Sequence, residues 1–193
     1  MEFISKIKES PKEQKKSLPI YLSETSKIRQ HIFNSPEFTF IFDKPDAGLD
    51  IGCAGDKLFK HMKGFDLPNP YSRCGDDRID YRGDASKISS YFPEDHWKFI
   101  YSSHLLEDFP NTKEVLADWK KIVKPDGYII LYLPNEQRYR SHCKKTGQQY
   151  NGSHKVLDMS CEYMEKIGKE IDLKVVYKLE EHGDYSFLIL FKK

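Results

Sequence analysis

The strongest chemical signal in the sequence is an acidic, glycine-containing segment, Leu49-Asp50-Ile51-Gly52-Cys53-Ala54-Gly55-Asp56. It continues a short apolar run that begins at Ala47, which predicts a buried strand ending in a tight turn. Small residues at such a turn let the backbone approach a bound molecule closely at the carboxyl edge of a sheet. A carboxylate at Asp50 would repel a pyrophosphate held there. The segment therefore favours a cationic or hydroxyl-rich ligand, with a simple turn capped by Asp50 as the alternative.

Two further acids follow predicted strands in order along the chain. Asp66 ends a predicted strand at 63–66, where its carboxylate could accept hydrogen bonds from the two vicinal hydroxyls of a ribose. Asp84 follows a third predicted strand, and it could accept from an adenine amino group while the Ala85 N–H meets the ring. The simpler roles are a turn-forming Asp66 before Pro68 and a helix-capping Asp84. Three acids at successive strand ends favour the ligand-binding interpretation.

A long connection after the fifth predicted strand carries many polar, aromatic and ionisable residues. It spans residues 134–158, at the sheet edge where ligands bind in α/β proteins. We expect its basic and aromatic side chains to hold an anionic acceptor such as a carboxylate or phosphate, because long loops in compact domains are often functional. The alternative is a solvated surface loop. The residues concerned are Arg138, Arg140, Tyr150, His154 and Lys155.

The elements that must position these residues alternate between strand and helix patterns. Strands are predicted at 47–51, 63–66, 79–82, 97–102 and 128–133, and a short helix is predicted from Ser23 to Phe33. An amphipathic helix is predicted from Asn111 or Thr112 to Val123, where Lys124-Pro125-Asp126-Gly127 stops it, with a left-handed turn at Gly127. A later helix is predicted at 160–171, and strands at 173–179 and 185–191 could pair antiparallel. The aromatic run 38–42 fits either a strand or an apolar lead-in.

Length, composition and charge restrict the class of protein. The 193 residues suit one folded domain, 23–193, because 12 Phe, 12 Tyr and 2 Trp supply large apolar side chains. Lys and Arg total 31 against 30 Asp and Glu, which gives no global attraction for nucleic acid or an anionic membrane. Residues 1–22 form a predicted basic arm. No membrane span, secretion signal or metal motif is apparent, so we expect a cytoplasmic protein with reduced cysteines.

From Ala47 to about Asn135 the chain resembles the class I S-adenosylmethionine-dependent methyltransferases. LDIGCAGD is similar to the glycine-rich first motif of that family, GFDLPN to its second-strand acid and YRGDAS to its adenine-contacting acid. FIYSSHLLEDFPNTKEVLADWKKIVKPDGYIILYLPNE, the most specific stretch, resembles the family's fourth strand through its fifth. The resemblance implies a Rossmann-like α/β fold, with a mostly parallel seven-stranded sheet and a C-terminal antiparallel hairpin. It also implies cofactor contacts from Asp50, Gly52, Cys53, Ala54, Asp66, Leu67, Asp84, Ala85, Ser102 and Ser103.

The resemblance places the reaction centre after the fourth strand, at His104. This histidine is the candidate base, because its ordinary pKa lies near neutrality. The equally open alternative is a packing or capping role, and Glu107 and Asp108 are expected to be structural or to shield the cofactor. The family usually has glycine where this chain has Ala54, which a negative φ would accommodate. Asp56 is expected to begin a shortened helix.

These observations predict methyl transfer from S-adenosylmethionine to oxygen or nitrogen of a small-molecule or carbohydrate-type acceptor. One alternative is a relative that binds the cofactor or a protein partner without catalysis. An RNA methyltransferase is less favoured, because Ser-Ser-His stands where amino-methylating enzymes of nucleic acids have Asn-Pro-Pro-aromatic. A nicotinamide-dependent oxidoreductase is also less favoured, because residues 52–55 fit G-x-G-x-x-G poorly. The oligomeric state is left open.

Overall fold

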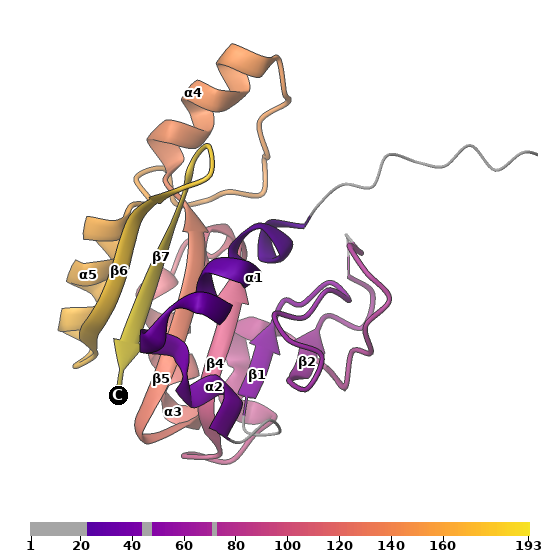
Figure 1. Cartoon of the computed structure of the whole chain (residues 1–193), viewed down its shortest axis with the longest axis vertical. Helices are drawn as coiled ribbons and strands as arrows, with labels where there is room; N and C mark the ends of the chain where they lie inside the picture. Colours follow the sequence, from indigo (N-terminus) through magenta and orange to yellow (C-terminus); the bar gives the residue numbers. More distant parts are fainter. Residues whose placement is uncertain (1–22, 44–47, 71–72) are drawn as a thin grey trace, which may run out of the picture.

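The computed structural model describes residues 23–43, 48–70 and 73–193, so the predicted basic arm at 1–22 lies outside the described residues. Its centre is a seven-stranded sheet in the order β3-β2-β1-β4-β5-β7-β6 (Figure 1). Neighbouring strands from β3 to β5 are parallel, and β7 pairs antiparallel with both β5 and β6. The predicted Rossmann-like fold is therefore confirmed. The strands are β1 (Gly48–Ile51), β2 (Lys63–Asp66), β3 (Tyr81–Arg82), β4 (Trp97–Ser103), β5 (Val123–Pro134), β6 (Lys174–His182) and β7 (Ser186–Lys192).

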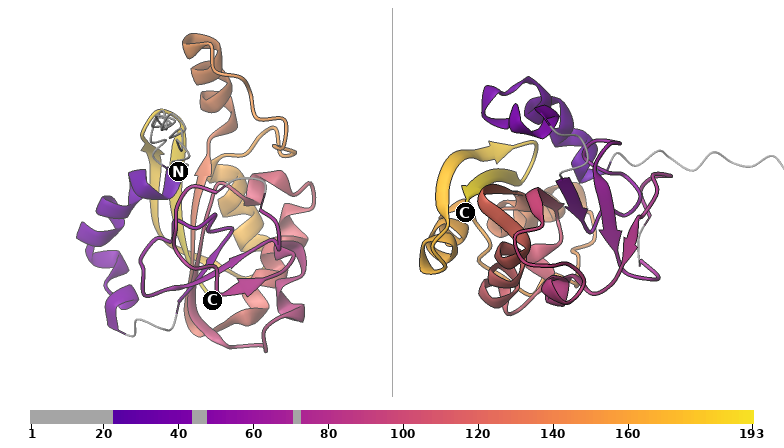
Figure 2. Two further views of the ribbon diagram at one scale, coloured as in Figure 1. Left: turned by 90° about the vertical axis from the view of Figure 1, so that its right-hand side faces the viewer. Right: turned by 90° about the horizontal axis from the view of Figure 1, so that it is seen from below.

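Helices cover both faces of the sheet, as Figure 2 shows from the side. One face carries α1 (Glu24–Asn34), the short turn η1 (Pro36–Phe38) and α2 (Phe40–Asp43). The other face carries α3 (Thr112–Ile122) and α5 (Cys161–Glu170), with the short turns η3 (Ala85–Ser90) and η4 (Leu106–Asp108). Helix α4 (Glu136–Thr146) projects beyond the end of β5 (Figure 1).

The central strands are mostly apolar because both of their faces are covered. In β5, Ile129 and Leu131 pack into the core with α3 and α5, whereas Ile130 and Tyr132 pack into the core with α1 and α2. All four side chains are fully buried. The two cores hold the parallel strands rigidly, so that the carboxyl ends of these strands can position a site.

The N-terminal helix α1 begins where the sequence predicts. The Ser23 side chain accepts a hydrogen bond from the Ser26 N–H, which satisfies one of the free donors of the first turn. The aromatic run 38–42 contains the last residue of η1 and the first three residues of α2, and so it serves as an apolar lead-in and not as a strand. Within it, Phe40 stacks on Tyr128 with ring centroids 4.0 Å apart. This contact ties the N-terminal helices to the sheet.

The segment that leads from the end of α3 into β5 differs from the prediction in two ways. Strand β5 begins at Val123, directly after α3, rather than at Tyr128. The left-handed residue is Asp126, with φ of 60°, and not Gly127. A Cβ at Gly127 would lie 2.6 Å from the carbonyl oxygen of Lys98 on β4. Glycine is therefore required there for the close approach of two strands.

The predicted long loop at 134–158 is partly helical. Asn135 caps α4 by accepting from the Arg138 N–H, and Gly147, with φ of 74°, ends the helix. The predicted C-terminal hairpin is present, with β6 and β7 paired from Lys174 opposite Lys192 to His182 opposite Ser186. No helix in the described part of the chain is long and apolar enough to cross a membrane.

Candidate active site

A cavity of about 430 Å³ opens at the carboxyl ends of β1, β2 and β4, beside the first turn of α1. Its volume lies within the range of pockets that bind small molecules and cofactors. The structure brings many of the predicted site residues together in its wall. They are Gly52, Cys53, Ala54, Asp66, Leu67, Asp84, Ala85, Ser103 and His104.

The glycine turn after β1 is shaped by three residues with positive φ. These are Gly52 at 74°, Ala54 at 46° and Gly55 at 77°. The negative φ that would accommodate an alanine is therefore not found at Ala54, and the left-handed conformation costs this residue about 1–2 kcal/mol. The Ala54 N–H donates to the Asp66 carboxylate at 2.7 Å, which holds the residue in this conformation.

The connection from β1 to β2 contains no helix, contrary to the shortened helix expected at Asp56. Side chains hold this connection instead. The Asp56 carboxylate accepts from Ser23 and, at 2.6 Å, from the Arg29 guanidinium, and both donors come from the α1 region. The buried Lys57 ammonium donates to the Met62 carbonyl at 2.8 Å. Helix α1 is thereby tied to the cavity wall.

Two predicted contact residues lie behind the cavity wall. Asp50 is buried and accepts from the Leu58 N–H at 2.7 Å, and this burial raises its pKa to about 8. Ser102 is also buried, and its hydroxyl donates to the Ile51 carbonyl at 2.9 Å. Neither lines the cavity, so the structure places both as supports of the strand ends.

Asp66 ends β2 with its carboxylate fixed by the backbone. One oxygen accepts from the Ala54 N–H and the other from the Leu67 N–H, each at 2.7 Å. A carboxylate oxygen can accept more than one hydrogen bond, so this oriented group retains capacity for ligand donors. Asp66 also has the turn-forming role expected from sequence, through the hydrogen bond that it accepts from the Leu67 N–H.

Asp84 caps the turn η3, which was the alternative left open by the sequence. Its Oδ1 accepts from the N–H and the hydroxyl of Ser86, and these hydrogen bonds lower the Asp84 pKa. The residue also lines the cavity, together with Ala85. The Ala85 carbonyl accepts from the Trp119 indole N–H at 2.7 Å, which anchors this part of the wall to α3.

His104 follows β4 in a left-handed conformation, with φ of 48°. Its Nε2 lies 3.1 Å from the Ser186 hydroxyl and 3.7 Å from Oε2 of Glu24, while its Nδ1 lies 3.6 Å from Oε1 of Glu107. Burial lowers the His104 pKa to about 4, although the nearby Glu24 carboxylate opposes this shift. The imidazole is therefore neutral at pH 7 and can accept a proton.

The cavity wall is acidic. Five carboxylic side chains line it, and no lysine or arginine of the described residues does so. The acids are Glu24, Asp56, Asp66, Asp84 and Asp108. Such a wall attracts cationic or hydroxyl-rich ligands and repels anions.

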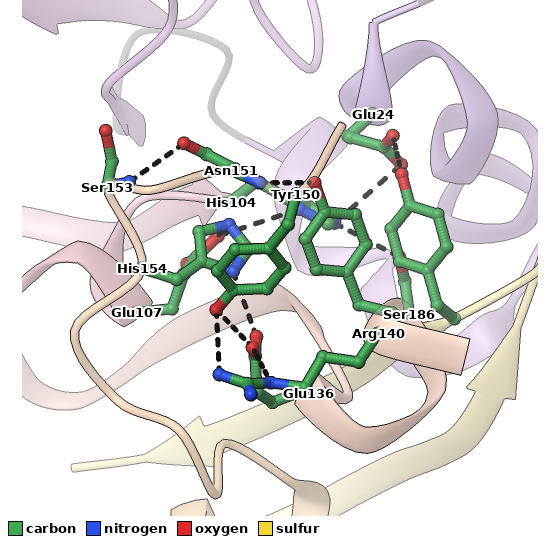
Figure 3. Close-up of polar contacts among 12 residues, drawn as sticks. Glu24, His104, Glu107, Glu136, Arg140, Tyr150, Asn151, Ser153, His154 and Ser186 are labelled. Carbon is green, nitrogen blue, oxygen red and sulfur yellow. Dashed lines mark hydrogen bonds and ion pairs between the residues drawn. The ribbon is translucent and has the colours of Figure 1, made fainter. Parts of the chain in front are cut away.

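The predicted acceptor-binding residues do not line this cavity. Arg140, Tyr150 and His154 instead converge on the buried carboxylate of Glu136, with Arg140 Nε and His154 Nδ1 each 2.9 Å from it (Figure 3). Arg138 pairs with Glu181 at 3.4 Å. The Lys155 ammonium donates to the Gly152 carbonyl at 3.1 Å. Most of these side chains therefore contact a buried carboxylate of the protein itself, that of Glu136, and not an external anion.

Three glutamates of this region were not predicted as site residues. Glu24 reaches the cavity from α1, whose docking beside β4 leaves no local sequence signal. Glu107 and Glu136 are fully buried, and an isolated glutamate gives no indication of burial in sequence. The arginine four residues after Glu136 was the available signal, because such pairs share a helix face.

The comparisons with known proteins agree with this geometry. A family described as "Methyltransferase domain" matches residues 26–177. No curated protein sequence matches the chain. Similar solved structures include an S-adenosylmethionine-dependent methyltransferase from Archaeoglobus fulgidus, with TM-score 0.63, 16% identity, and 88% of this chain and 94% of that chain covered.

Two further structures show the same fold. The S-adenosylmethionine-dependent methyltransferase from Mesorhizobium loti has TM-score 0.56 and 13% identity, with 84% of this chain and 100% of that chain covered. One from Methanosarcina mazei has TM-score 0.56 and 15% identity, with coverage of 82% and 97%. At these identities the likeness concerns the fold, while the family match extends over most of the chain. The chain therefore belongs to the methyltransferase-domain family, as a class I enzyme whose cofactor is S-adenosylmethionine.

Proposed function

We propose that the protein methylates an amine or hydroxyl group of a small, uncharged or cationic acceptor, which includes carbohydrate-type molecules. The observation that carries this proposal is His104, a neutral imidazole in the wall of an acidic cavity. A neutral imidazole has a free nitrogen that can take a proton, and the facing Glu24 carboxylate would offset the low His104 pKa by stabilising the imidazolium. The acidic wall disfavours a phosphate or carboxylate acceptor, and it equally disfavours the backbone of RNA.

The residues of the wall fit the cofactor. We assign Asp66 to the ribose hydroxyls, because its carboxylate is oriented by two backbone N–H groups and keeps accepting capacity. Asp84 is assigned to the adenine amino group and Ala85 to the ring, with Leu67 beside them. Gly52, Cys53, Ala54 and Ser103 would then meet the methionine portion. The negative wall also suits the positive charge of the sulfonium.

When bound, S-adenosylmethionine supplies an electrophilic methyl group. The part of this chain is to orient the acceptor so that its lone pair points at that group, and to take its proton. His104 Nε2 lies on the side of Glu24, another residue of the cavity wall, and we assign proton removal to this nitrogen. Glu24 has a lowered pKa, to which the attraction of His104 and Lys27 contributes against the opposing effect of burial. Its negative charge would stabilise the imidazolium.

The first test is calorimetric titration with S-adenosylhomocysteine of the wild type, Asp66→Asn and Asp66→Ala. We expect saturable binding that weakens about tenfold or more in Asp66→Ala, because two ribose hydrogen bonds are worth at least 1.4 kcal/mol. Glu162→Ala, an exposed change on α5, should bind like the wild type. Absence of binding by the folded wild type would refute the assignment of the site.

The second test is transfer of a labelled methyl group from S-adenosylmethionine to panels of amines, polyols and sugars. Turnover that is lost in His104→Asn would support the proposal. Cofactor binding without turnover of any panel member would instead favour the non-catalytic relative, and turnover of an RNA would refute the acceptor class.

A further inference from the structure

A row of carboxyl and imidazole groups runs from the cavity wall to the buried first residue of α4 (Figure 3). It passes from Glu24 to His104, then to Glu107, His154 and Glu136. The successive separations are 3.7, 3.6, 3.7 and 2.9 Å. Acids and imidazoles thus alternate along the row.

Glu107 lies at the centre of this row and is fully buried. The same oxygen, Oε1, lies 3.6 Å from Nδ1 of His104 and 3.7 Å from Nε2 of His154. Neither carboxyl oxygen of Glu107 has a hydrogen-bond partner among the residues that the structure describes. Burial raises its pKa well above the usual range, which favours the protonated acid. A proton on Oε1 would lie between the two imidazoles.

The far end of the row is buried under Arg140. Glu136 accepts from His154, from Tyr150 and from the Arg140 guanidinium. The Arg140 side chain is 49% exposed, while that of Glu136 is fully buried. In the tautomer in which His154 donates its Nδ1 proton to Glu136, its Nε2 carries no proton and faces Glu107.

We propose that Glu107 is a positioning residue that passes its proton to His154 when His104 takes the proton of the methyl acceptor. This inference rests on the proposed function of His104. The bond from the acceptor atom to hydrogen breaks and a bond from hydrogen to Nε2 of His104 forms. At the same time the Oε1–H bond of Glu107 breaks and an N–H bond forms at Nε2 of His154.

The charges balance in this step. Before transfer the row from His104 to Glu136 carries one negative charge, on Glu136. One proton enters, and the row then alternates imidazolium, carboxylate, imidazolium and carboxylate, with no net charge. Each new charge has an opposite neighbour, which a buried ion requires. Without Glu107 ionising, the imidazolium of His104 would have Glu24 as its nearest counter-charge in this row.

Other charged groups also face this row, and they affect its titration. The groups that act on Glu107 or His104 from neighbouring elements are Glu24 and Lys27 of α1, Asp108 of η4, Glu136 of α4 and His154. The described residues contain no group of three or more His, Cys, Asp or Glu side chains that could hold a metal ion. The row is therefore interpreted as a path for protons and not as a metal site.

The ligand-free test is NMR of the wild type and Glu107→Gln, with carbon-13 in glutamate carboxyls and nitrogen-15 in histidine rings. Glutamine keeps the size and neutral charge of protonated Glu107 but cannot release a proton. We expect a protonated Glu107 carboxyl at pH 7 and a shared titration midpoint for the His104 and His154 rings. In Glu107→Gln the midpoints should separate, with that of His104 falling by about one pH unit or more. An ionised Glu107 at pH 7, or identical ring titrations in both proteins, would overturn the proposal.

Two more variants guard against a folding defect. His154→Gln keeps a donor for Glu136 but removes the proton acceptor, so it should lower the His104 midpoint in the same way. Glu162→Gln on α5 is the matched control and should change neither ring. If Glu107→Gln does not fold, His154→Gln decides: an unchanged His104 midpoint would refute the relay.

Measurements of turnover test whether the row takes part in catalysis. With an acceptor found in the panels, Glu107→Gln should lower kcat about tenfold or more and leave KM unchanged, because only proton removal is impaired. Wild-type kcat in this variant would overturn the relay even if His104 is the base. Loss of activity in His104→Asn, but not in Glu107→Gln, would thus retain the proposed function and reject the further inference.

Discussion

Replacing Asp50 by asparagine should make the stability of the protein less sensitive to a rise in pH between pH 4 and pH 8, without weakening cofactor binding. The Asp50 carboxyl is 1% exposed, and its Oδ2 accepts from the Leu58 N–H. Burial raises its pKa from 3.8 to about 8, while the hydrogen bond from Leu58 opposes the shift. An asparagine oxygen can accept the same hydrogen bond, but an amide cannot ionise.

The sign follows from the number of bound protons. Between pH 4 and pH 8 the folded protein holds a proton on Asp50 that the unfolded chain has released, so the free energy of unfolding falls as the pH rises. One proton corresponds to about 1.4 kcal/mol per pH unit. The wild type should therefore lose about 3 kcal/mol relative to Asp50→Asn between pH 5 and pH 7, and the difference should level off above pH 8.

The assay is urea unfolding of both proteins at pH 5, 6, 7 and 8.5. Asp50→Ala is the matched control: it also lacks the titration, but it leaves the buried Leu58 N–H without its acceptor, at a cost of about 1–3 kcal/mol. Equal pH slopes for wild type and Asp50→Asn would refute the buried, protonated carboxyl. A tenfold loss of S-adenosylhomocysteine affinity in Asp50→Asn would instead restore the direct cofactor contact expected from sequence.

Three further predictions follow from backbone geometry and ion pairs. Ala54→Gly should raise the free energy of unfolding by about 0.5–1 kcal/mol in thermal or urea unfolding, since glycine relieves the positive φ; a loss of stability would contradict this. Gly127→Ala should lower the free energy of unfolding by about 1–3 kcal/mol, because the added Cβ would lie 2.6 Å from the Lys98 carbonyl oxygen; an unchanged urea midpoint would count against it. Arg138→Ala and Lys155→Ala should each leave the acceptor KM within about twofold, because neither lines the cavity, and a KM rise of tenfold would return them to the acceptor site.

Most of the fold could be predicted because its signals are local. Strand β2 at Lys63–Asp66 is bounded as predicted, and α5 lies inside its predicted range with Ser160 as its cap. Apolar runs, capping residues and helix periodicity are short-range properties of the chain. The role of Gly127 was harder to predict. A glycine that lets two neighbouring strands approach closely cannot be distinguished in sequence from a glycine that ends a helix.

The candidate site was predictable only where strand ends determine it. Asp66 ends β2, Asp84 lies two residues after β3 and His104 follows β4 directly. The parallel topology therefore brings them to one cavity. The partners of Arg140 and His154 could not be predicted, because the fold of the segment after β5 turns these side chains toward Glu136. A cluster of basic residues indicates that an acid is near, but not whether it belongs to the protein or to a ligand.

The short connection after β1 explains why the carboxylates of Asp50 and Asp66 accept hydrogen bonds from its backbone. Strand β1 has four residues, so the chain must return about 13 Å before β2 can begin parallel to it. A helix would use about nine residues for that distance, which leaves almost none of residues 52–62 for the two turns. The chain returns without a helix, and its backbone N–H groups then need other acceptors. Asp50 and Asp66 supply them at Leu58 and Ala54. In a connection this short, an acid beside the glycine turn stabilises the backbone before any cofactor binds. Asp66 lines the cavity and Asp50 does not, and this position alone distinguishes Asp66 as a ligand contact.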